Sequence, residues 1–208
     1  MTRTALAGLA VAAAVLTVPA AARDAGGAYA IKGTGQQACA DYVQAYAAAE
    51  RTEGASLLLY RGWLEGYLTG FNHFQDETYD LAPWQTTELM LAMLAKHCAG
   101  APERSFTDAT NALALVFYPD RLDTESELVR VEANGQAVFL YRATVEAVRA
   151  RLRALGHDAG PADAAFGRSY ANALKAFQAG RGLTVSGLPD QPTMNALFLA
   201  TDTPEPTE

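Results

Sequence analysis

The sequence is poor in cysteine, in histidine and in long apolar runs, and each scarcity excludes a class of function. Its 208 residues include only 2 cysteines and 3 histidines. Because His73, His97 and His157 have no spacing that presents metal ligands on one helix face, we expect no metal site. No glycine-rich phosphate loop and no basic patch interleaved with aromatic residues is present. Nucleotides and nucleic acid are therefore not expected partners, and we predict no cofactor.

The apolar run near the N-terminus is too short to span a bilayer comfortably. Arg3 precedes "ALAGLAVAAAVLTV", and small residues then follow at the offsets of a cleavage site after Ala22. This pattern predicts a secretory signal peptide over residues 1–22. A membrane anchor is the alternative, but no basic flank follows the run. We therefore expect an exported, periplasmic protein that is free of the membrane after cleavage.

The two cysteines, Cys39 and Cys98, agree with export. An even number of cysteines in a chain bound for an oxidising compartment favours one disulfide over a metal site or a nucleophile. Closing a loop of about 60 residues would stabilise the fold by ~4 kcal/mol in the chain-entropy model. Two buried free thiols are the alternative reading.

The first half of the mature chain, residues 37–118, reads as a helical bundle. Its apolar residues recur with helical spacing and never alternate as they would in a strand. The disulfide would tie the first helix to the end of the third. The expected elements are helices over 38–52 and 55–73, a third helix that begins at Pro83, and a fourth that Ser105 caps while Asp108 reaches back to it.

Three glycines, Gly62, Gly66 and Gly70, fall on one stripe of the second expected helix. A glycine inside a helix costs about 1 kcal/mol relative to alanine, so three of them need a reason. Close approach of a neighbouring helix is the leading explanation, and a groove for a partner peptide is the other. The charges of Arg61 and Glu65 argue against a membrane span.

The one clear β signal lies in "LVRVEANGQAVFLY". Apolar residues alternate on both sides of Asn134-Gly135, the pair that best accepts a type I′ turn. We expect a hairpin within residues 126–142 that docks its valine face on a helical neighbour and connects two domains. The turn sets the facing pairs as Val131 with Val138, Val129 with Leu140, and Arg130 with Phe139.

Three short helices are predicted over residues 144–199, and together they would enclose one small core. Gln178 should bond to the backbone, while Leu174 and Phe177 should lie in the core. The tail over 200–208 is acidic and proline-broken, and is expected to lack structure. The first helix should be capped by Thr144 and end at Gly156. The second should be anchored by Phe166 and end at Gly180, and the third should be capped by Asp190.

This C-terminal stretch resembles the three-helix peptidoglycan-binding domain of exported cell-wall proteins. The shared features are "LRALG", "FG" at 166–167, "ALKAFQ" at 173–178 and the later Gly187. The resemblance implies that fold and a peptidoglycan partner. Three positions depart from the family pattern: Ala164 replaces a glycine, Tyr170 a threonine and Arg149 a glutamine. These departures bear on ligand binding more than on the fold.

Exposed polar residues of this stretch are the candidates for wall contact. Arginine suits the carboxylates of stem peptides because its planar fork donates two parallel hydrogen bonds. The net charge of -7 offers no long-range attraction to an anionic wall, so recognition would be local. The alternative is that each is an ordinary solvated side chain, as such residues more often are. The candidates are Asp163, Arg168, Asn172 and Arg181.

The first half has a resemblance of its own. Between its two cysteines it carries "WLEGYLTGFN", followed by Asp80, and "APERSFTDATNAL" comes after Cys98. Over residues 37–117 this is similar to the exported helical proteins related to the HdeA acid-stress chaperone and the Tai-type immunity proteins of type VI secretion. The resemblance implies a compact bundle with one disulfide that works by binding other proteins.

No constellation in the sequence predicts an enzyme. Glu65 lacks a partner carboxylate, and a disulfide would silence both cysteines. We therefore expect a mostly α protein made of a disulfide-tied bundle, a hairpin and a wall-binding module. Its leading function is non-catalytic: it anchors the first domain to peptidoglycan. The first domain would also bind a periplasmic protein. The alternative is an immunity or chaperone-like protein whose wall-binding module is degenerate.

Overall fold

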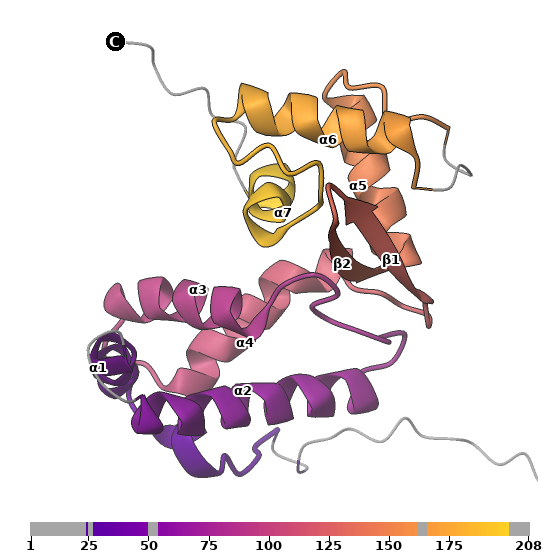
Figure 1. Cartoon of the computed structure of the whole chain (residues 1–208). Helices are drawn as coiled ribbons and strands as arrows, with labels where there is room; N and C mark the ends of the chain where they lie inside the picture. Colours follow the sequence, from indigo (N-terminus) through magenta and orange to yellow (C-terminus); the bar gives the residue numbers. More distant parts are fainter. Residues whose placement is uncertain (1–23, 25–26, 50–53, 162–165, 200–208) are drawn as a thin grey trace, which may run out of the picture. The chain divides into compact units, whose positions relative to one another are not determined.

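Helices make up most of the regular structure, as the apolar spacing predicts. The computed structural model describes residue 24 and residues 27–49, 54–161 and 166–199. The predicted signal peptide and tail, together with Asp163 and Ala164, lie outside these ranges. The elements, traced in Figure 1, are η1 (Gly33–Gln36), α1 (Cys39–Ala49), α2 (Ala55–Phe74), α3 (Thr87–Ala99), α4 (Phe106–Phe117), η2 (Tyr118–Asp120), β1 (Leu128–Ala133), β2 (Gln136–Tyr141), α5 (Arg142–Ala154), α6 (Arg168–Gly180) and α7 (Gln191–Phe198).

The mostly α fold class is confirmed, and the described residues contain two hydrophobic clusters. One cluster is built from α1 to α4 and the other from the hairpin and α5 to α7. The domain boundaries at 37–118, 126–142 and 144–199 stay a prediction. No helix in the described ranges combines the length and the apolar character needed to cross a membrane.

The first cluster is held by packed aromatic rings and by a disulfide. The ring centroid of Tyr42 lies 4.6 Å from that of Phe106 and 5.0 Å from that of Tyr60. The Tyr42 hydroxyl donates to the carbonyl of Leu91 at 2.6 Å, which satisfies the one polar atom of this buried ring. The predicted Cys39–Cys98 disulfide is confirmed, and it joins the start of α1 to the end of α3.

The capping predictions in this half are confirmed at one helix and wrong at another. Ser105 and Asp108 form the predicted capping box at the start of α4. The helix expected to begin at Pro83 begins instead at Thr87, because the Thr86 hydroxyl accepts from the backbone N–H of Leu89. A side-chain cap that satisfies a free N–H determines this start more strongly than the backbone angle of a proline.

The explanation offered for the glycine stripe of α2 is wrong. A Cβ added at Gly62, Gly66 or Gly70 would meet no described atom within 4 Å, so no neighbouring helix approaches there. The buried residues of α2 are Tyr60 and Leu64, which lie on the opposite side of the helix from the stripe. The stripe therefore faces away from the aromatic cluster.

The hairpin prediction is confirmed in its register. Val131 pairs with Val138, Val129 with Leu140, and Arg130 with Phe139. Asn134 and Gly135 both have positive φ, at 52° and 76°, as a type I′ turn requires. The side chains of Val129 and Val131 are buried in the same cluster as the core residues of α5, so the valine face docks on helices as expected.

One helix boundary in the second cluster differs from the prediction, and a second agrees with it. Thr144 does not cap α5. The helix begins at Arg142, the Ser126 hydroxyl accepts from the N–H of Ala143, and Thr144 is buried inside the first turn. Gly180 is the last residue of α6, as predicted. The left-handed turn follows at Gly182, at φ 65°, where the N–H of Leu183 donates to the carbonyl of Gln178.

The other C-terminal boundary predictions agree with the structure. Gly156, at φ 85°, follows the last turn of α5, and the N–H of His157 donates to the carbonyl of Leu152. Asp190 caps α7 by accepting from the N–H of Thr193 at 3.1 Å. The helix anchored by Phe166 begins two residues later, at Arg168.

Candidate functional site

Gln178 organises the loop between α6 and α7, and this structural role confirms its predicted backbone bonding. Its side chain has no exposed surface. Its Nε2 donates to the carbonyl of Leu188 at 2.9 Å and to the Thr193 hydroxyl at 2.8 Å, while its Oε1 accepts from the N–H of Gly187. A buried amide with both ends satisfied fixes the backbone of this loop.

The two departures from the family pattern that the structure describes meet inside the core. Arg149 is 3% exposed and donates to the carbonyl of Ala159, and its guanidinium carbon lies 5.1 Å from the centroid of the Tyr170 ring. Tyr170 is 1% exposed, and burial raises the pKa of its hydroxyl. The arginine and the tyrosine therefore pack together in the interior, where they affect the core and not an exposed ligand surface.

The described wall-contact candidates are all exposed, but they lie at opposite ends of α6. Arg168 and Asn172 are four residues apart on α6 and share one face near its start. Arg181 follows the last residue of the same helix. Because a helix rises 1.5 Å per residue, Arg168 and Arg181 are separated by about 20 Å along the axis. A single small chemical group cannot contact both arginines.

Arg181 instead lies beside a histidine that sequence reasoning considered only as a metal ligand. A depression of about 190 Å³ is lined by Leu155, His157, Phe177, Gly180 and Arg181. The chain turns sharply at Gly156 and again at Gly182, one residue away from His157 and Arg181 respectively. The two helix-ending glycines are the sequence signal that could have placed these side chains near each other.

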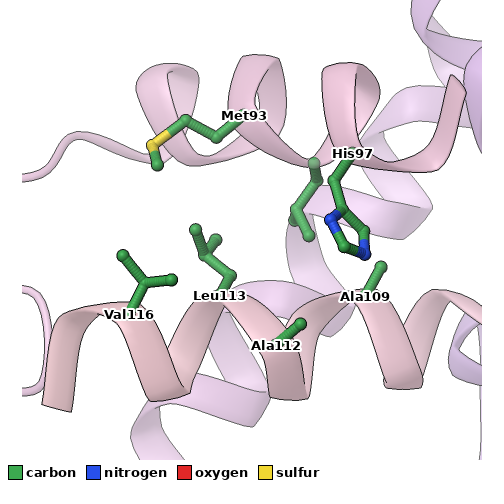
Figure 2. A pocket seen from close by; sticks show the side chains of 7 residues that line it. Met93, His97, Ala109, Ala112, Leu113 and Val116 are labelled. Carbon is green, nitrogen blue, oxygen red and sulfur yellow. The ribbon is translucent and has the colours of Figure 1, made fainter. Parts of the chain in front are cut away.

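A second hollow lies between α3 and α4 (Figure 2). Met93 and His97 extend from α3 toward Val116, Leu113 and Ala112 of α4. The hollow measures about 220 Å³, and its lining is apolar apart from the histidine. On α4, Val116 lines the hollow and is 58% exposed. These two helices therefore present an apolar groove to solvent.

Glu65 and the residues considered for metal binding do not gather into a metal-binding cluster in the described part of the chain. Glu65 accepts a hydrogen bond from Arg61 at 3.1 Å and another from the Thr87 hydroxyl at 3.3 Å, as an ordinary surface carboxylate does. Across residues 27–49, 54–161 and 166–199, no three His, Cys, Asp or Glu side chains gather closely enough to hold a metal ion.

Comparison with known proteins supports the C-terminal reading. Residues 141–197 match the model of the peptidoglycan binding domain family. The match begins at the last residue of β2 and ends within α7, so it covers α5, α6 and nearly all of the last helix. The chain as a whole matches no curated protein and no solved structure. Peptidoglycan is thus the partner supported for this part of the chain, and cell-wall association follows from it.

Proposed function

We propose that this protein is an exported, non-catalytic peptidoglycan-binding protein that anchors a helical interaction domain to the cell wall. The family match over residues 141–197 carries the proposal. The satisfied bonding of Gln178 and the buried Phe177 support it, because they give the matched segment an ordered core on which surface residues can be positioned.

Binding to purified sacculi tests the anchoring role directly. The chain from Arg23 onward, which lacks the predicted leader, should sediment with sacculi at low salt and stay soluble without them. The Phe177→Ala variant should lose binding together with its C-terminal fold, because truncating a buried aromatic costs ~3–5 kcal/mol. Circular dichroism monitors the fold. A folded wild-type chain that stays in the supernatant would exclude anchoring.

The apolar groove between α3 and α4 supports a role for the bundle in binding other proteins. Its apolar lining, which includes the exposed Val116, suits an apolar segment of a partner chain, since burying such surface yields about 25 cal/mol per Å². This same groove favours the alternative function, in which the protein acts as a chaperone-like or immunity protein through its first half and the wall-binding module has lost its affinity.

An aggregation assay addresses the chaperone-like alternative. If the groove holds unfolded clients, the chain should reduce light scattering from heat-denatured citrate synthase. The variant Val116→Asp, which alters an exposed residue of the groove lining and should leave the fold intact, should not. Equal scattering with and without the wild-type protein would exclude the chaperone-like role. Sacculus binding by the same preparation would separately support anchoring.

A further inference from the structure

Two side chains with hydrogen-bond donors converge where α5 and α6 end. The ring of His157 meets the ring of Phe177 edge-on, with centroids 5.9 Å apart. The guanidinium carbon of Arg181 lies 5.5 Å from the centroid of the same ring. Because Phe177 is only 2% exposed and fixed in the core, it positions both side chains over one depression.

The shape of this depression suits a small group. Its volume of about 190 Å³ is below the roughly 300–1,000 Å³ typical of sites that enclose drug-sized ligands. A Cβ added at Gly180 would meet no described atom within 4 Å, so this part of the rim is open. The depression can therefore receive the end of a peptide more readily than it can enclose a disaccharide.

The chemistry of the lining favours an anion. Arg181 offers a planar fork of donors and His157 offers ring nitrogens, while no acidic side chain lines the depression. The chain as a whole has a net charge of -7, so this lining is a local exception to the overall charge. A carboxylate is the anionic group that a peptidoglycan stem peptide presents, whereas its glycan hydroxyls are neutral.

We propose that the depression formed by His157, Phe177 and Arg181 binds a carboxylate of the peptidoglycan stem peptide. This inference rests on the proposed wall-binding function and deepens it by naming the group that is recognised. Arg181 donates to the carboxylate, His157 donates from the neighbouring wall, and the buried Phe177 holds both in place. Arg168, at the other end of α6, makes no contribution to this site.

Matched variants of the chain from Arg23 onward test the site. Arg181→Ala should weaken binding to sacculi by about tenfold or more, as expected for a charge-assisted hydrogen bond. Arg168→Ala removes the same charge from the same helix and should leave affinity within about twofold. Arg181→Lys keeps a cation at the helix end but removes the fork, so its affinity should fall between the two.

A chemical control identifies the group on the wall. Sacculi whose free carboxylates have been converted to methylamides should bind the wild-type chain as weakly as unmodified sacculi bind Arg181→Ala. Equal wild-type affinity for both kinds of sacculi, or an equal loss of affinity in Arg181→Ala and Arg168→Ala, would overturn the proposed carboxylate site while leaving wall binding intact. A lower melting temperature for Arg181→Ala with unchanged affinity would assign Arg181 to offsetting the helix dipole instead. Absence of wild-type binding to either kind would overturn both proposals.

Discussion

Replacing Gly66 with alanine should stabilise the protein, because Gly66 lies in the middle of α2 and in the middle of its glycine stripe. Alanine is favoured over glycine inside a helix by about 0.8–1 kcal/mol. The new Cβ would meet no described atom within 4 Å, so no steric cost offsets this gain. With a shift of about 2–4 °C per kcal/mol for a chain of this size, the melting temperature should rise by roughly 2–4 °C.

Two further variants make the test quantitative. Gly62 and Gly70 are eight residues apart, about 12 Å along the helix, so their replacements should add to roughly 1–2 kcal/mol in a double variant. Gly35→Ala is the opposite control, because its Cβ would lie 2.3 Å from Cζ2 of Trp63. Forcing the indole aside should cost about 1–3 kcal/mol.

Thermal unfolding followed by circular dichroism, with urea titration as a second measurement, reads out all of these variants. A lower midpoint for Gly66→Ala would contradict the expected gain, since it would require an atom packed against the stripe. A Gly35→Ala variant as stable as the wild-type chain would contradict the close approach of Trp63. The outcome decides whether the α2 glycines are dispensable for the fold.

Three other properties should follow from the structure. A thiol count on the unreduced, denatured chain should be zero, and replacing Cys39 and Cys98 by serine should cost ~4 kcal/mol in a urea titration; two reactive thiols would contradict the disulfide. Burial raises the pKa values of Tyr42 and Tyr170, so the unfolded chain releases these protons first and the free energy of unfolding should fall as pH rises above about 10. The urea midpoint should decrease less over that range for Tyr170→Phe, and an identical decrease in the variant would argue against this origin. Thr144→Val should leave the melting temperature unchanged or raise it by a few degrees, because the buried hydroxyl has no hydrogen-bond partner among the described residues, and a clear loss would show that such a partner exists.

Features that depend on a few neighbouring residues could be predicted from the sequence. The hairpin register follows from Asn134-Gly135, since only a residue pair that tolerates positive φ allows this turn. The capping box at Ser105 and the cap at Asp190 follow from a side-chain oxygen three residues before a free N–H. Each of these structures is decided within one turn of chain.

Predictions failed where several local signals competed. Near the start of α3, Pro83 and Thr86 are both plausible helix starts, and only the hydrogen bond to Leu89 selects the threonine. At the start of α5, Thr144 is a plausible cap, but the helix begins at Arg142 and the Ser126 hydroxyl accepts from the N–H of Ala143. The energies that separate such neighbours are of order 1 kcal/mol, so packing of the whole helix decides between them.

Patterns along the chain are enough to predict the class of the protein: its helical halves, its hairpin, its cysteine pair and the three-helix pattern of the C-terminal stretch. These follow from periodicity and turn chemistry, which act between residues close together along the chain. The tertiary structure alone decided which side of α2 is exposed, that Arg149 packs over Tyr170, and that Arg181 joins His157 instead of Arg168. These side-chain contacts depend on how helices that are distant in sequence pack, and on the direction in which the chain leaves each helix. The spacing of residues along a single helix or strand determines neither.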